Sequence, residues 1–110
     1  MIPRHNNLSD LEIAIPFVDE EGAAAGIPAY DFEIDFFTNE RGRRVTASQK
    51  NGVLTNCSVE DGNVLVCHFD RPRLGRGRLK SRKTWHIPDP DFPDEEYTLV
   101  EESVIDVMIY

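Results

Sequence analysis

The chain has 110 residues, of which 40% are apolar and 29% charged, and its formal net charge is −8. This length fits one ordinary domain, and this balance is typical of a folded globular chain rather than a disordered one. No run approaches the roughly 18 apolar residues that a membrane-spanning helix needs, and residues 1–10 lack the apolar stretch of a secretory signal. We therefore expect no membrane partner and no export signal in this sequence.

The charge is distributed in three blocks of alternating sign. Residues 1–70 carry a net charge of −7, residues 71–83 carry +7, and residues 84–110 carry −8 without a single Lys or Arg. The acidic surroundings of the basic block disfavour nucleic acid as a ligand. The blocks instead predict a domain that neutralises itself or docks onto oppositely charged protein neighbours.

Taken in chain order, residues 1–10 predict a flexible arm and residues 11–110 a single domain. Apolar residues alternate with polar ones at a period of two, which indicates strands rather than helices. In the stretch Tyr30–Thr38, for example, Phe32, Ile34 and Phe36 share one face, and Asp31, Glu33 and Asp35 share the other. The expected strands are Glu12–Val18, Tyr30–Thr38, Arg44–Gln49, Leu54–Val59, Val64–Phe69, Arg76–Ile87 and Leu99–Tyr110.

Turn residues separate these strands. Asn51-Gly52 and Asp61-Gly62 are strong hairpin signals, and Glu40-Arg41-Gly42 marks a further tight turn. Asp19–Ala25 is the one stretch that could form a helical turn. Leu99–Tyr110 has apolar residues on both faces, which predicts an interior strand covered on both sides. Together these elements predict an all-β, immunoglobulin-like antiparallel β-sandwich of about seven strands.

The basic block predicts a binding surface. Arg76, Arg78, Lys80 and Arg82 recur at every second position, so a strand would place them on one face. They could form a stripe that binds an acidic protein partner. The same pattern also fits a solvated strand face that discourages edge-to-edge pairing, and both interpretations stay open.

Two cysteines, Cys57 and Cys67, lie ten residues apart across the Asp61-Gly62 turn. A hairpin would bring them close together. Two cysteines are too few for a disulfide scaffold, so we expect two reduced, half-buried thiols. A cross-strand disulfide or a shared metal site remains an alternative, and the sequence does not settle the redox state.

Trp85 alternates with the basic stripe and falls on the face of Leu79 and Ile87, which predicts packing in the core. The alternative is an exposed platform for a carbohydrate, formed with His86 and the acidic loop Asp89–Glu96. That loop could in principle hold Ca²⁺, but its spacing is not that of an EF-hand, so a stiff solvated loop is expected.

Nothing in the sequence predicts catalysis. The three histidines are accompanied by no nucleophile-elbow, zinc-protease, phosphate-loop or Cys-His signature. No motif calls for a cofactor or a metal. We therefore expect a binding protein rather than an enzyme.

The layout resembles a known family. A first strand (Leu11–Val18), an aromatic and acidic strand (Tyr30–Phe36), a Gly-bearing hairpin and a late strand leading to Ile87–Asp94 follow one another. This order is similar to the immunoglobulin-like N-terminal domain of phage tail baseplate and fibre proteins, in particular those of prophages in gut bacteria. The resemblance departs at Gly26–Ala29, where an apolar-Thr-Gly turn is usual, and it carries over no functional residue.

The resemblance implies a structural assembly module that contacts other protein subunits, either its own copies or tail components. It also implies a cytoplasmic location before assembly and a place in the virion afterwards. A carbohydrate-binding β-sandwich that uses Trp85 and the acidic loop is the alternative function.

Overall fold

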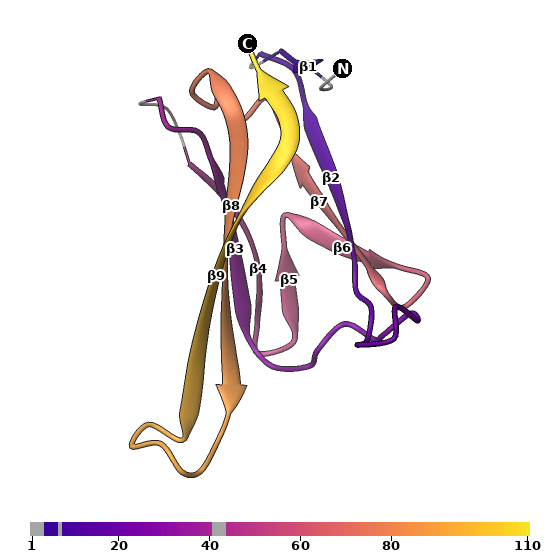
Figure 1. The fold of residues 1–110 in the computed structure, drawn as a ribbon, viewed down its shortest axis with the longest axis vertical. Helices are drawn as coiled ribbons and strands as arrows, with labels where there is room; N and C mark the ends of the chain where they lie inside the picture. Colours follow the sequence, from indigo (N-terminus) through magenta and orange to yellow (C-terminus); the bar gives the residue numbers. More distant parts are fainter. Residues whose placement is uncertain (1–3, 7, 41–43) are drawn as a thin grey trace.

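The computed structural model describes residues 4–6, 8–40 and 44–110, and this part of the chain contains nine β-strands and no helix (Figure 1). The strands form two sheets that enclose one core, so the expected all-β sandwich is confirmed. The strands are β1 (Arg4–His5), β2 (Leu11–Pro16), β3 (Phe32–Phe37), β4 (Val45–Lys50), β5 (Val53–Thr55), β6 (Cys57–Glu60), β7 (Val64–Phe69), β8 (Gly77–Pro88) and β9 (Glu96–Ile109).

The two sheets differ in size. The larger has six strands in the order β1-β9-β8-β3-β4-β5, and the smaller has three in the order β2-β7-β6. Neighbouring strands are antiparallel except β1 and β9, which run parallel. Within the segment 1–10 that the sequence predicts as an arm, Arg4 and His5 thus pair with Met108 and Ile109.

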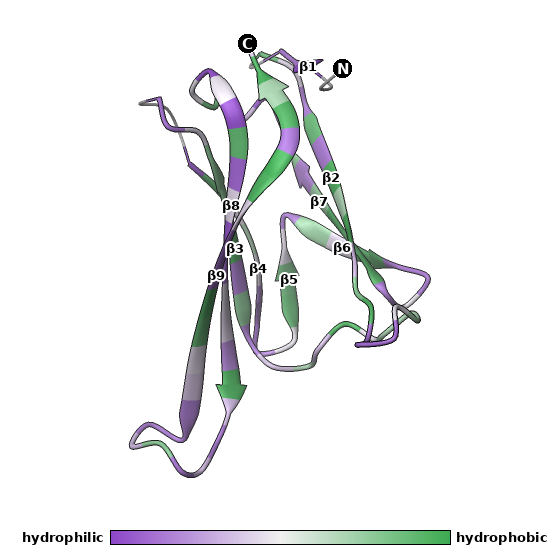
Figure 2. Ribbon diagram, in the orientation of Figure 1, coloured by the Kyte–Doolittle hydropathy of each residue, from purple (hydrophilic) through white to green (hydrophobic). Residues whose placement is uncertain are grey.

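The core lies between β3 and β8 of the large sheet and β7 of the small one. The alternation seen in the sequence places Phe32, Ile34 and Phe36 of β3 inward, each with none of its surface exposed. From the opposite sheet, the Phe69 ring meets the Phe36 ring edge to face, with centroids 5.4 Å apart. Figure 2 shows the corresponding alternation of apolar and polar residues along β3. Burial of these apolar side chains is the main force that holds the sheets together.

The stretch Leu54–Val59, predicted as one strand, is two strands in different sheets. β5 pairs with β4 in the large sheet, whereas β6 pairs with β7 in the small one. The break falls at Asn56, whose φ of 59° lies in the left-handed region. Asparagine tolerates this conformation better than most residues, so it can redirect the chain from one sheet to the other.

The turn predictions have mixed outcomes. Asn51-Gly52 and Asp61-Gly62 both have positive φ at their two residues, as tight hairpin turns require, and are confirmed. The Asp19–Ala25 stretch is a turn rather than a helix, in which the Asp19 carboxylate accepts hydrogen bonds from the backbone of Glu21 and Ala23. The turn expected at Glu40-Arg41-Gly42 lies mostly outside the described residues.

The prediction of an interior strand covered on both sides at Leu99–Tyr110 is confirmed only in part, because β9 lies between β1 and β8 in the sheet but one of its faces is uncovered. β9 begins earlier, at Glu96, and pairs with β8 on one side, while β1 joins its other side only at Met108 and Ile109. Val100 and Val104, on the outer face of the sheet, are 53% and 54% exposed. The β8–β9 hairpin also extends past the ends of the neighbouring strands as a projecting arm (Figure 1).

Candidate functional site

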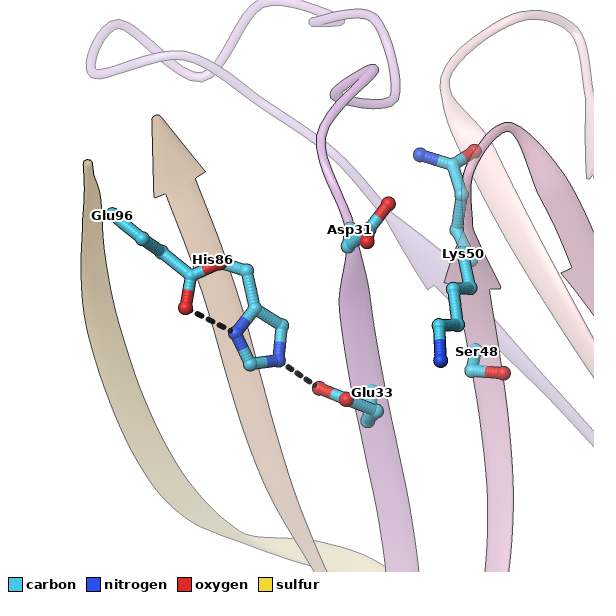
Figure 3. Close-up of a pocket in the computed structure, with 7 residues that line it drawn as sticks. Asp31, Glu33, Ser48, Lys50, His86 and Glu96 are labelled. Carbon is cyan, nitrogen blue, oxygen red and sulfur yellow. Dashed lines mark hydrogen bonds and ion pairs between the residues drawn. The ribbon is translucent and has the colours of Figure 1, made fainter. Parts of the chain in front are cut away.

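A histidine held between two carboxylates lies on the outer face of the large sheet. His86 of β8 contacts Glu96 of β9 through Nδ1 at 3.0 Å and Glu33 of β3 through Nε2 at 2.5 Å (Figure 3). These residues line a shallow cavity of about 350 Å³, together with Asp31, Ser48, Gln49 and Lys50. Alternation in the sequence places Glu33 and His86 on outward faces, but only the pairing of β3 with β8 brings them together.

The cluster links three strands, because His86 of β8 contacts Glu96 of β9 and Glu33 of β3. We call this group of three residues the ionic staple. The hydrogen bond with Glu96 raises the pKa of His86, burial lowers it, and Glu33 adds to the rise, so that the pKa lies above its ordinary value. A protonated imidazole donates to both carboxylates at once, whereas a neutral one donates to only one of them. Because both ring nitrogens are engaged, neither is free to take a proton from a substrate.

We expect the substitution His86→Gln to cost more stability at acidic pH than at alkaline pH. Since the folded-state pKa is raised, the contribution of His86 is fully present below its pKa in the unfolded chain. It is lost as the pH rises through the folded-state pKa. Urea unfolding of both proteins across about pH 5 to 9 measures the difference in free energy.

A matched variant, Glu96→Gln, should weaken the same pH dependence, because it removes the strongest partner of the imidazolium. A stability difference between wild type and His86→Gln that is flat, or that grows with pH, would contradict this role.

A second histidine has the connectivity of a catalytic triad but not its setting. On the outer face of the small sheet, His68 Nε2 lies 3.2 Å from the Ser58 hydroxyl, and its Nδ1 lies 3.8 Å from a Glu12 carboxylate oxygen. The second distance is too long for a hydrogen bond, and the His68 and Glu12 side chains are 50% and 68% exposed. An open, wet sheet face does not provide the preorganised, water-excluded environment that activates a serine.

Three of the four side chains of the predicted basic stripe contact groups of the same chain. Arg82 contacts Glu102 at 2.7 Å through Nε, and Arg78 lies 3.8 Å from Asp106, both across the β8–β9 pair. Lys80 Nζ donates to the Asn39 side chain at 2.8 Å. Arg76 precedes β8, and its backbone N–H donates to the Glu40 carboxylate. The stripe is therefore partly neutralised from within, which weakens its attraction for an acidic partner.

Trp85 faces the core as the alternation predicts. It is 9% exposed and packs against the Phe17 and Phe32 rings at 5.9 and 5.4 Å. It is thus no exposed platform, which was the feature that the carbohydrate alternative required. Its edge instead borders an apolar groove of about 310 Å³ on the inner side of the sheet, lined by Phe17, Gly26, Pro28, Tyr30, Trp85, Ile87, Leu99 and Glu101.

The acidic loop Asp89–Glu96 is organised by its own backbone. The Asp89 carboxylate accepts from the Asp91 N–H at 3.0 Å, and Asp89 and Glu95 are joined by a backbone hydrogen bond of 2.9 Å. The Phe92 and Tyr97 rings lie 5.3 Å apart across the tip of the arm. Within the described ranges, no group of three or more His, Cys, Asp or Glu side chains is placed to hold a metal ion.

The free edge of β9 is the feature that sequence reasoning missed. From Glu96 to Val104 the strand pairs with β8, and among the described residues no strand lies on its other side. Nine residues of extended strand span roughly 30 Å. We call this stretch the free edge.

The pairing pattern identifies the backbone groups that the free edge presents. The His86 N–H bonds to the Asp31 carbonyl of β3, so the backbone groups of Trp85 and Ile87 point the other way, toward β9. Their partners in register are Leu99 and Tyr97, which therefore use their N–H and C=O groups on β8. The alternating residues direct theirs outward; these are Thr98, Val100, Glu102 and Val104.

In the residues that the structure covers, no helix is both long and apolar enough to span a membrane. Comparison with protein-family models, with curated proteins and with solved structures finds no match to this chain. Its function must therefore be argued from the geometry of the free edge and of the clusters beside it.

Proposed function

We propose that this domain is a non-catalytic assembly module that binds an extended segment of a partner protein along the free edge of β9. The observation that carries the proposal is the nine-residue edge whose outward backbone groups face no strand in the described structure. Natural proteins usually protect such edges with Lys, Pro, bulges or a covering loop, because an open ladder recruits another chain. Residues 96–104 contain neither Lys nor Pro, and the protection they do carry is acidic: Glu96, Glu101 and Glu102 discourage a like-charged strand but not a basic one.

Strand addition supplies both affinity and selectivity from elements that this edge possesses. The outward N–H and C=O groups of Val100 and its alternating neighbours would continue the hydrogen-bond ladder into the partner. Side chains of the added strand would then fall alternately on the two faces of the sheet. On the inner face the added strand would pass beside the apolar groove at Leu99 and Trp85, which favours an apolar residue at the adjoining position.

The charge of the edge indicates the chemistry of the partner. Of the three carboxylates on residues 96–104, Glu96 and Glu102 contact His86 and Arg82, whereas Glu101 on the rim of the groove is exposed. A second copy of β9 would bring the same carboxylates alongside, and like charges on neighbouring strands destabilise pairing. The edge therefore favours a basic, extended segment of a different protein over self-association.

The resemblance to phage tail and baseplate domains is compatible with this proposal, because such particles are built from contacts between subunits. The internally paired basic stripe makes Arg76, Arg78, Lys80 and Arg82 a weaker candidate surface than the free edge. Engagement of both nitrogens of His86 supports the non-catalytic part of the proposal.

The test uses a fluorescent nine-residue peptide of alternating Val and Lys, with a Val-Glu peptide as its acidic twin. We expect the basic peptide to bind, with an affinity that falls as salt is added, and the acidic twin to bind far more weakly. The substitution Val100→Pro should lower the affinity roughly tenfold or more, because it removes an outward N–H and obstructs close approach.

The fold should survive Val100→Pro, since this N–H faces away from β8 and proline is tolerated at sheet edges. Val100→Thr, which keeps the N–H and the branched Cβ, is the matched control and should bind like the wild type. Circular dichroism and urea unfolding check that both variants are folded. Equal binding of the two peptides, or full binding by a folded Val100→Pro variant, would refute strand addition at this edge.

A further inference from the structure

The small sheet contains a pair of cysteines that face each other across a hairpin. Cys57 of β6 and Cys67 of β7 are directly opposite in register. Both are free thiols, with Cys67 fully buried and Cys57 partly exposed. The hairpin expected from the sequence thus brings the two residues together, and the register makes them direct partners.

The hydrogen-bond pattern determines how close they are. The His68 N–H donates to the Asn56 carbonyl at 2.9 Å, which makes Asn56 and His68 a hydrogen-bonded pair. Pairs alternate along an antiparallel ladder, so the next pair, Cys57 and Cys67, is of the non-hydrogen-bonded kind. Such partners have Cα atoms about 4.5 Å apart and their side chains close together, within the range that a disulfide spans.

The two thiols also point in the same direction. Cys67 belongs to the core cluster, and Cys57 packs against that cluster from the edge strand. The Cys57 thiol donates weakly to the Ser48 carbonyl of β4, at 3.6 Å, across the space between the sheets. Rotation of one side chain about its Cα–Cβ bond, at the cost of this weak contact, would bring the sulfur atoms together.

We propose that Cys57 and Cys67 form a reversible cross-strand disulfide when the domain meets a low-molecular-weight disulfide such as oxidised glutathione. The Cys57 thiolate, the more accessible of the two, attacks one sulfur of the oxidant and expels a glutathione thiolate. The Cys67 thiolate then attacks the Cys57 sulfur of the mixed disulfide and expels the second glutathione. Two protein thiols become one disulfide, and their two electrons and two protons convert the oxidant into two reduced glutathiones.

The environment makes this reaction slow but its product persistent. Burial, followed by the neighbouring Cys57, raises the pKa of Cys67 to about 12, and burial also raises the pKa of Cys57. Few thiolates are therefore present near neutral pH, and the resolving step waits for the hairpin to open locally. β6 is an edge strand, so this opening separates it from a single neighbour. Once formed, the bond closes the β6–β7 hairpin and restricts the unfolded chain.

The experiment incubates the reduced, full-length protein with excess oxidised glutathione at mildly alkaline pH, in buffer and in moderate urea that promotes hairpin opening. We expect an intact mass lower by two hydrogen atoms, without retained glutathione, and an increase in Tm of roughly 10 °C that dithiothreitol reverses. Cys57→Ser is the matched control: it should gain no intramolecular bond and show no such shift.

Three results would overturn the proposal. They are a glutathione adduct that persists on the protein, disulfide-linked dimers in place of the internal bond, or an internal bond that leaves Tm unchanged or lower. None of these bears on strand addition at β9, which belongs to the other sheet, so the two proposals fail independently.

Discussion

Replacing Phe36 by alanine should lower the free energy of unfolding by about 3–5 kcal/mol, enough to unfold a large fraction of a marginally stable domain. Phe36 has no exposed surface, and its ring packs edge to face on Phe69 of the opposite sheet. Truncation removes apolar contacts and leaves a cavity between two sheets that cannot fully collapse into it. Urea unfolding followed by fluorescence or circular dichroism measures the loss.

The adjacent residue provides the matched control. Phe37 has the same side chain but points to the outer face of the sheet, where Arg44 stacks on its ring at 4.4 Å. Phe37→Ala should therefore cost only about 1 kcal/mol, the value of a partly exposed cation–π contact. Equal losses for the two substitutions would mean that the inner and outer faces of β3 are assigned incorrectly.

The second large effect is expected at Gly75, which lies in the buried approach to β8. A Cβ atom at this position would lie 2.6 Å from the Glu40 carbonyl oxygen and 2.6 Å from Thr38 Oγ1. One of these groups is backbone, so the clash cannot be relieved by turning a side chain. We expect Gly75→Ala to destabilise the fold by about 1–3 kcal/mol, as overpacking does elsewhere.

Gly26→Ala is the control for this substitution. No atom lies within 4 Å of a Cβ built on Gly26, and its φ is not in the left-handed region. The added methyl restricts the unfolded chain without a clash, so the variant should be as stable as the wild type or slightly more stable. Thermal melts of the two variants side by side measure the contrast, and a Gly75→Ala variant as stable as Gly26→Ala would show that the segment near Glu40 gives way easily.

The projecting β8–β9 arm joins the features that bear on function. The ionic staple of His86 links β9 to β3 at the base of the arm. The Arg82–Glu102 pair links β9 to β8 within the body of the sheet, where β8 also pairs with β3. These cross-strand contacts fix the arm from its β8 side and leave the opposite edge open. An edge whose strand is already held by these contacts presents its backbone groups in a preformed arrangement, which reduces the ordering cost of binding.

The histidine cluster illustrates where sequence reasoning stops. The alternation within Tyr30–Thr38 places Glu33 outward, and that within Arg76–Ile87 does the same for His86. Whether the two meet depends on which strands are neighbours and in which register, and nothing local specifies either. The same gap led to the expectation of an interior strand at Leu99–Tyr110. Apolar residues on both faces suggested cover on both faces, but Val100 and Val104 are exposed on the outer face.

By itself, the sequence determined that this protein is built of strands, which side chains face the core, and where the hairpins at Asn51-Gly52 and Asp61-Gly62 turn. These properties follow from the two-residue period of an extended chain and from the local conformational preferences of Asn, Asp and Gly. Only the tertiary structure decided that the chain changes sheets at Asn56, that β9 is left with an open edge, and that His86 lies between Glu33 and Glu96. Those outcomes depend on contacts between residues far apart in the chain, whose energies are settled by the packing of the whole sandwich.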